Sequence, residues 1–251
     1  RRKFLKQAAL GSTPFILPSH IWAAKGDASP NSRINVAIIG PGKQGRSHTH
    51  RLIRNPRAQV TGFAEVAKVR TDHTKALIEK HYGQNTPGKD WKGLTITRDY
   101  RELLADKQVD AVLIATPDHW HGEPTILAAR AKKHIYCEKP ISLTIKEGRA
   151  MVKAVNDNKV TFLTGSQQRT EFGGKFRKTV ELIRSGAIGE IKKIRVCVGG
   201  PPKPCDLPTE KVPEGIDWDA WQGPAPTRGY NKALCPDDVH NHFPRWRAYR
   251  E

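Results

Sequence analysis

The chain has 251 residues, 37% of them hydrophobic, with a mean hydropathy of −0.61. These values predict a soluble globular protein of one large or two small domains, and no run of about 18 apolar residues beyond the N-terminal region predicts a membrane span. The net charge of +18 is compatible with nucleic-acid binding. The basic residues, however, are scattered along the chain without an aromatic-rich RNA motif or a zinc finger, so we expect no nucleic-acid partner.

Residues 1–30 have the pattern of an export signal. Residues 1–6 read Arg-Arg-Lys-Phe-Leu-Lys, and a weakly apolar stretch over residues 8–24 follows. Paired arginines before such a stretch resemble a twin-arginine signal, which exports folded proteins, and the alternative is a basic amphipathic helix. We therefore expect a periplasmic protein and treat residues 1–30 as a leader outside the fold.

A glycine-rich turn follows the first apolar run, Ile34–Ile39. Gly40, Gly42 and Gly45 have the spacing G-x-G-x-x-G, and helix-compatible sequence comes next. This order predicts a strand, a tight turn and a helix whose N-terminal N–H groups hold a pyrophosphate. The expected contacts with the cofactor pyrophosphate are Gly40, Gly42, Lys43, Gln44 and Gly45.

The next apolar run, Val60–Ala64, ends in Glu65, 20 residues after Gly45. A carboxylate at this spacing is expected to accept hydrogen bonds from the adenosine ribose of a dinucleotide. It would repel the 2′-phosphate of NADP, so the sequence favours NAD. Lys68 and Arg70 follow closely and would be able to neutralise a phosphate, which keeps NADP possible.

Strands and helices continue to alternate up to residue 165. We expect strands at 34–39, 60–64, 109–115, 134–137 and 160–163, and helices at 46–54, 69–82, 100–105, 124–132 and 144–156, with Asp99 as an N-cap and a polar loop over 84–93. The alternation predicts an α/β fold with a doubly wound parallel sheet, a Rossmann domain over residues 31–165. The polar motifs follow strand ends, where ligands of such sheets bind.

The composition changes from about residue 166. A helix is expected over Lys175–Ser185, and the alternating apolar residues of Glu190–Val198 predict the first strand of a different sheet. Beyond Gly199 the chain is rich in Pro, Gly and Trp without clear periodicity. We interpret residues 166–251 as the start of an incomplete α+β domain for substrate binding and oligomerisation.

A second motif, Glu138-Lys139-Pro140, follows an expected strand. Together with the glycine turn and Ala115-Thr116-Pro117 it resembles the Gfo/Idh/MocA family (glucose–fructose oxidoreductase and inositol dehydrogenase), over about residues 33–251. The Trp-x-x-Trp-x-Gly-Pro-Ala-Pro segment is similar to exported bacterial members. The resemblance implies an NAD(P)-dependent oxidoreductase that moves a hydride between nicotinamide and a hydroxyl or ketone of a sugar, cyclitol or related polyol.

The same resemblance implies roles for individual residues. Lys139 would be the catalytic residue, because an ammonium beside the reacting oxygen favours the alkoxide and can move its proton. Pro140 permits a cis Lys–Pro bond that would aim Lys139 into the cleft. Further contacts on the nicotinamide side are implied for Thr116, Pro117, His119, Glu138, Gln168 and Arg169.

One part of the family pattern is not found. An Asp-x-x-x-His segment that supplies the usual base does not occur up to Glu251, so we expect the chain to be a fragment of a longer protein. The resemblance also implies that the full-length protein forms a homo-oligomer. The open alternatives are an NAD-dependent glycosidase that works by transient oxidation and elimination, and a non-catalytic dinucleotide-binding module.

Other residues with possible chemistry have simpler interpretations. Residues 119–121 and 240–242 both read His-x-His, which is too few ligands for a metal site, and we expect none. Trp218 and Trp221 are expected to pack a Pro-rich loop rather than to stack on a sugar. The four cysteines form no C-x-x-C; free thiols are favoured over a Cys205–Cys235 bridge, which export would permit.

Overall fold

The computed structural model describes residues 32–84, 93–169 and 171–249. The expected leader and most of the expected polar loop lie outside the described residues. The centre of the fold is a six-stranded sheet in which every pair of neighbours is parallel, in the order β3-β2-β1-β4-β5-β6. This is the doubly wound order of dinucleotide-binding folds, so the expected fold class is confirmed.

The expected strands and helices alternate, and a short strand at Thr95–Thr97, which the sequence analysis did not predict, is added. The strands are β1 (Ile34–Ile39), β2 (Ala58–Ala64), β3 (Thr95–Thr97), β4 (Ala111–Ile114), β5 (His134–Glu138) and β6 (Phe162–Gly165). The longer helices are α2 (Lys43–Leu52), α3 (Lys68–Gln84), α4 (Tyr100–Ala105), α5 (Gly122–Arg130), α6 (Ile145–Asn158), α7 (Lys175–Arg184) and α8 (Trp218–Gln222). Short 3₁₀ helices cover Asp118–Trp120, Gln167–Arg169, Phe172–Gly174 and Arg245–Ala248.

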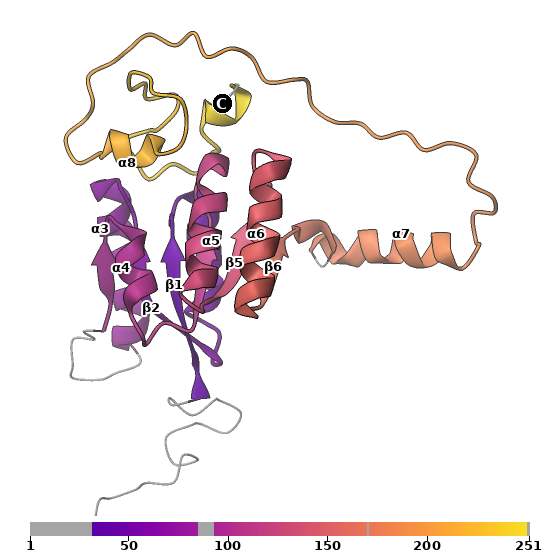
Figure 1. Ribbon diagram of the computed structural model, residues 1–251, viewed down its shortest axis with the longest axis horizontal. Helices are drawn as coiled ribbons and strands as arrows, with labels where there is room; N and C mark the ends of the chain where they lie inside the picture. Colours follow the sequence, from indigo (N-terminus) through magenta and orange to yellow (C-terminus); the bar gives the residue numbers. More distant parts are fainter. Residues whose placement is uncertain (1–31, 85–92, 170, 250–251) are drawn as a thin grey trace, which may run out of the picture.

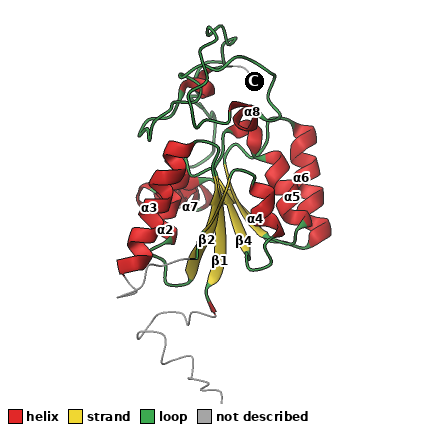
Figure 2. Ribbon diagram, turned by 90° about the vertical axis from the view of Figure 1, so that its left-hand side faces the viewer, coloured by secondary structure: helices red, strands yellow, loops and turns green. Residues whose placement is uncertain are grey.

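Helices cover both faces of the sheet, with α2 and α3 on one face and α4, α5 and α6 on the other (Figure 2). Successive residues of a strand point to opposite faces, and β1 shows the result. Its Ala37 and Ile39 belong to the core cluster under α4, α5 and α6, while Val36 and Ile38 belong to the cluster on the α3 side. A strand buried on both faces explains the unbroken apolar run that precedes the glycine turn.

Side-chain caps begin three of these helices. Asp99 accepts a hydrogen bond from the Arg101 N–H ahead of α4, as expected. Thr144 accepts one from the Glu147 N–H ahead of α6, and Asp217 accepts one from the Ala220 N–H ahead of α8. The main boundary difference is α2, which begins at Lys43 rather than at Arg46, because the helix starts inside the glycine motif. The first turn of α2 therefore lies directly at the turn that follows β1.

The prediction of a strand over Glu190–Val198 is wrong, because these residues form neither a helix nor a strand. Ile194 and Val198 are 76% and 83% exposed. A strand needs a neighbour to pair its backbone groups, and no described segment lies beside this one. The α+β character of residues 166–251 and the domain boundary near 165 stay predictions.

The last third of the chain leaves the sheet and returns to it. Helix α7 projects sideways, and the chain then arches back to the carboxyl ends of the strands (Figure 1). There Trp218, Trp221, Tyr230, Leu234 and Cys235 form a third core cluster. Among the described residues, no helix has the length and apolar character needed to cross a membrane.

Candidate active site

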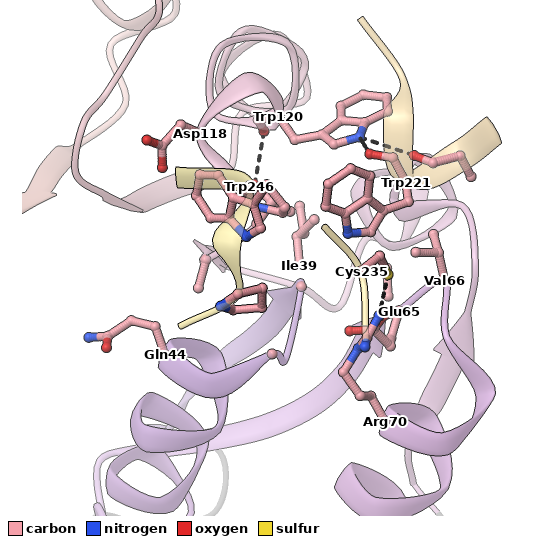
Figure 3. A pocket seen from close by; sticks show the side chains of 18 of the residues that line it. Ile39, Gln44, Glu65, Val66, Arg70, Asp118, Trp120, Trp221, Cys235 and Trp246 are labelled. Carbon is pink, nitrogen blue, oxygen red and sulfur yellow. Dashed lines mark hydrogen bonds and ion pairs between the residues drawn. The ribbon is translucent and has the colours of Figure 1, made fainter. Parts of the chain in front are cut away.

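A cavity of about 360 Å³ lies at the carboxyl ends of the strands. The turns after β1, β2, β4 and β5 form its inner walls, and residues from the C-terminal part of the chain form the outer wall (Figure 3). Strand order reverses between β1 and β4, and such a switch point is where doubly wound sheets bind ligands. The fold therefore places the cavity where the sequence analysis expects the cofactor.

The glycine turn is shaped for a close-approaching anion. Gly40 has a φ of +79°, and a Cβ there would lie 2.8 Å from Thr116 Cγ2. A Cβ on Gly45 would lie 2.4 Å from Gly40 O, so this glycine allows α2 to pack against the turn. A Cβ on Gly42 would meet no protein atom within 4 Å. Open space beside free N–H groups at a helix start fits the pyrophosphate of a dinucleotide.

Glu65, at the end of β2, is buried in the wall of this cavity. Its Oε1 accepts hydrogen bonds from Ala67 N at 2.9 Å and from Arg70 Nε at 3.2 Å. In the part of the chain that the structure describes, Oε2 has no donor. One carboxylate oxygen is therefore left to accept from ribose hydroxyls, which fits an adenosine at this position.

Arg70 is not available for a 2′-phosphate, which corrects the expectation from its position in the sequence. Its side chain is buried, Nη1 donates to Pro236 O at 2.8 Å, and Nη2 contacts Cys235 Sγ at 3.4 Å. Although burial opposes its charge, Glu65 raises the pKa of Arg70. Lys68 points outward and pairs with Asp72 on α3.

Glu138 ends β5 and lies inside a hydrogen-bonded group. His48 Nε2 lies 2.6 Å from Glu138 Oε1, and Gln44 Nε2 donates to the same oxygen at 3.3 Å. Burial opposes ionisation, but these hydrogen bonds and the charge of His48 lower the pKa of Glu138 below its ordinary value. Helix α2 thus contributes both its N-terminus and two side chains that fix the carboxylate.

Lys139 follows Glu138, lines the cavity and precedes Pro140 in a cis peptide bond. Among the described residues it forms no ion pair. His121 ties this turn to the one after β4, because its Nδ1 lies 2.5 Å from Pro140 O and its Nε2 lies 3.0 Å from Thr116 O. His121 therefore fixes the turn that carries Lys139, and Lys139 lines a cavity where a ligand can contact its ammonium.

Asp118 lines the same cavity and has an unusual environment. Burial raises the pKa of its carboxyl, and the charges of His121, Arg247 and Lys139 act in the opposite direction. A lysine and a carboxyl group beside one cavity provide both a proton donor and an acceptor for a bound hydroxyl.

The structure brings together most of the expected site residues and leaves out four. Gly40, Gly42, Lys43, Gln44, Glu65, Thr116, Pro117, Glu138 and Lys139 line the cavity. Gly45 lies behind the turn, and Gln168 is exposed outside the cavity. Instead of lining the cavity, His119 is buried with Nε2 2.9 Å from Trp221 O. The side chain of Arg169 lies outside the described residues.

The outer wall was not expected from the sequence. Residues from the C-terminal part of the chain line the cavity, and Figure 3 shows Trp246 there together with Gln44, Glu65 and Asp118. Asp217, Ala220 and Trp221 at α8 line this side, and the rest of the wall consists of Leu234, Cys235, Pro236, His240, Phe243, Pro244, Trp246 and Arg247. No local motif marks them, because their contacts are with residues far away in the sequence.

Three remaining groups of residues were singled out in the sequence. Trp218 and Trp221 are buried and stack with ring centres 4.8 Å apart, and Trp221 also lines the cavity. In the described ranges no three possible metal ligands gather, and His240 Nδ1 contacts His242 O. All four cysteines are free; the Cys205–Cys235 bridge is not formed.

Comparisons with known proteins agree with this geometry. Residues 34–166 match the sequence model of a family described as an oxidoreductase family with an NAD-binding Rossmann fold, GFO_IDH_MocA. The chain is 30% identical to myo-inositol 2-dehydrogenase of Thermotoga maritima over 176 residues, which is 69% of this chain and 48% of that protein. It is 44% identical to 2,7-anhydro-N-acetylneuraminate hydratase of Escherichia coli over 89 residues, 36% of this chain and 23% of that protein.

A solved structure shares the fold: scyllo-inositol dehydrogenase from Lactobacillus casei with bound NAD(H) and scyllo-inositol. It superposes with a TM-score of 0.53 at 23% identity, covering 63% of this chain and 43% of that one. The chain spans less than half the length of the first curated relatives it matches. The family match extends over more than half of this chain and includes the glycine turn and the Glu138-Lys139-Pro140 motif. The chain therefore belongs to the Gfo/Idh/MocA oxidoreductase family and carries its NAD-binding Rossmann fold.

Proposed function

We propose that the protein is an NAD-dependent oxidoreductase that acts on a hydroxyl or ketone of a sugar, cyclitol or related polyol. The observation that carries the proposal is one cavity that joins the glycine turn, the ribose-binding carboxylate Glu65 and the ammonium of Lys139. Bound NAD supplies the hydride acceptor or donor in this chemistry. The residues described here bind and orient the reactants and manage the proton.

The cofactor end of the cavity supports NAD over NADP. The N–H groups at the start of α2 would hold the pyrophosphate beside Gly42, and Glu65 Oε2 would accept hydrogen bonds from the adenosine ribose. A 2′-phosphate on that ribose would face a buried carboxylate, and Arg70, the buried arginine bonded to this carboxylate, is already committed to Pro236 and Cys235. We therefore expect NADP to bind more weakly.

At the other end, Lys139 holds or takes the proton of the substrate oxygen. An ammonium near that oxygen stabilises the negative charge that develops on it, and general acid–base help of this kind is typically worth about 10²–10⁴-fold. Asp118 accepts a hydrogen bond from a neighbouring hydroxyl. Glu138, fixed by His48 and Gln44, holds the turn that carries Lys139.

A second function is favoured by the 44% identity to the anhydro-sugar hydratase. The same site would oxidise a substrate hydroxyl, allow elimination or addition next to the new carbonyl, and return the hydride. A net dehydrogenase accumulates NADH with a polyol, whereas this cycle converts its substrate without net NADH. Following product and NADH absorbance in one reaction separates the two.

The proposal also includes export by the twin-arginine route and a homo-oligomeric full-length protein. The Arg-Arg-Lys-Phe-Leu-Lys opening supports export, because this route accepts folded, cofactor-loaded proteins. Replacing Arg1 and Arg2 by lysines should keep the protein in the cytoplasm of a bacterial host, and equal periplasmic yields would contradict the signal. Light scattering of the full-length protein tests the oligomer, and a monomeric mass would contradict it.

A fluorescence titration of NADH into cofactor-free protein tests the cofactor site. We expect saturable binding, weaker binding of NADPH, and at least about a hundredfold loss in Gly42→Val, whose side chain would fill the pyrophosphate space. Because no protein atom lies near a Cβ at position 42, this variant should fold normally, and circular dichroism checks that. Gly83→Val, also with open space around its Cβ but outside the cavity, is the control. Unchanged NADH binding in Gly42→Val, or none in the parent, would overturn the cofactor site.

A further inference from the structure

Residues 235–247 form a cover segment along the outer side of the cavity. Two arginines of the Rossmann half fasten it: Arg70 Nη1 donates to Pro236 O at 2.8 Å, and Arg46 Nη2 donates to His240 O at 2.5 Å. Both arginines are buried. The cover segment is therefore held by α2 and α3, the helices that follow the glycine turn and Glu65.

Near its end, the cover segment brings a second cation to the glycine turn. Lys43 Nζ, in the first turn of α2, lies 4.0 Å from the centre of the Phe243 ring. Arg247 Cζ lies 4.4 Å from the centre of the same ring. Lys43, Phe243 and Arg247 all line the cavity. One aromatic ring thus holds two cations that come from opposite ends of the described chain.

Within the described ranges, Lys43 and Arg247 form no ion pair, whereas Arg70 and Arg101, which also line the cavity, each pair with a carboxylate. Two like charges gathered on one ring repel each other, and a group with two negative charges between them would remove that repulsion. The open space at Gly42, next to Lys43, is where the pyrophosphate of a dinucleotide fits.

We propose that Lys43 and Arg247, held by Phe243, form a two-cation clamp on the cofactor pyrophosphate. The glycine turn contacts the pyrophosphate from one side, and Arg247 closes on it from the cover segment. The proposal rests on the proposed function and adds a cofactor-binding residue from outside the Rossmann half. An arginine that reaches the phosphates from the other wall would slow cofactor release.

A competing role for Arg247 has to be separated in the test. Its charge also acts on Asp118, so the alternative is that Arg247 serves the substrate end of the cavity. ADP-ribose contains the adenosine and the pyrophosphate but lacks the nicotinamide. A pyrophosphate clamp holds NADH and ADP-ribose equally, whereas a group at the nicotinamide or substrate end holds only NADH.

The test compares Arg247→Gln with Arg245→Gln in the same chain. Both arginines are exposed and lie in one 3₁₀ helix, but Arg245 does not line the cavity. We expect Arg247→Gln to raise the Kd of NADH and of ADP-ribose by the same factor, on the order of tenfold, with faster NADH release in stopped-flow. Its affinity should also depend less steeply on salt, since one ionic contact is gone. Arg245→Gln should match the parent.

The outcomes separate the clamp from the proposed function. A loss for NADH alone, with ADP-ribose unchanged, overturns the clamp and leaves the cofactor site intact. Equal effects of the two substitutions also overturn it, because they would reflect only general surface charge. If the parent protein binds neither probe, the proposed function fails and the clamp fails with it.

Discussion

The Rossmann half and the stretch from α7 to residue 198 both have periodic apolar residues, yet they differ in what covers those residues. In β1, alternate side chains enter two core clusters on opposite faces of the sheet. In residues 190–198, alternate side chains such as Val196 and Val198 are 74% and 83% exposed. An apolar period thus predicts which residues share a face, but burial needs a second surface to pack against.

Helix α7 extends the same contrast to helices. Its side chains Phe176, Val180 and Ile183 are 56%, 45% and 38% exposed, whereas Leu103 of α4 is fully buried between α4 and the sheet. Both helices are amphipathic in sequence. The difference lies in their position, because α4 packs on one face of the sheet against β2 and β3, while α7 projects away from the sheet (Figure 1).

The largest expected effect compares the same substitution in both regions. Leu103→Ala opens a cavity in the core and should lower the free energy of unfolding by about 2–5 kcal/mol. Leu182→Ala, on the exposed side of α7 at 45% exposure, should change it by about 0.5 kcal/mol or less. Urea denaturation of the three proteins measures both values. Equal losses of unfolding free energy in the two variants would show that α7 is buried in solution and would contradict the contrast between the two regions.

A smaller effect is expected when a methyl group is added to a glycine in each region. In Gly45→Ala the new Cβ would lie 2.4 Å from Gly40 O, so the turn or helix must shift, at a cost of about 1–3 kcal/mol. In Gly199→Ala the Cβ would meet no atom within 4 Å. Thermal unfolding should show a lower midpoint for the first variant and no change for the second. NADH affinity should fall only in Gly45→Ala, and a loss in both variants would contradict this account.

The smallest effect is a change in pH dependence at Glu138. Its pKa is lower in the folded protein than its ordinary value of 4.5, so its contribution to stability is present above that value and is lost as the pH falls through the folded pKa. Glu138→Gln should therefore lose on the order of 1 kcal/mol near neutral pH and show a shallower fall in stability on acidification. Chemical denaturation at a series of pH values measures this. Glu181→Gln, which removes the exposed Arg177–Glu181 ion pair on α7, is the control. If stability falls equally on acidification in the Glu138 variant and in the parent, the His48–Glu138 interaction does not contribute to it.

Local patterns predicted the parts of the fold that depend on neighbouring residues. The strand before Gly40, the capped helix after Asp99 and the strand that ends at Glu138 all follow from apolar runs with adjacent turn or capping residues. Since these strands pair in parallel, their ends meet at one edge, and this brought the separate motifs into one cavity. The strand expected at 190–198 does not form, because a strand needs a neighbouring strand to pair with, and the alternation of apolar residues gives no information about such a neighbour.

The site was predictable only on its inner side. Gly42, Glu65 and Lys139 follow strands and carry recognisable motifs, so sequence reasoning placed them correctly at the carboxyl ends. The inward turn of Arg70 and the cover segment depend on contacts between residues 166 and 194 positions apart. His119 also took a packing position because α8, about a hundred residues later, supplies the carbonyl that its ring contacts. Such contacts have no signature near either residue.

The direction of β1 has a practical consequence. The chain enters the sheet at Ile34, at the amino ends of the strands, while the cavity lies at their carboxyl ends (Figure 1). Six residues of strand, about 20 Å, separate the two edges. A partner that contacts the start of β1 therefore meets the fold on the side opposite the cavity, so that this contact and a ligand in the cavity need not compete for the same surface.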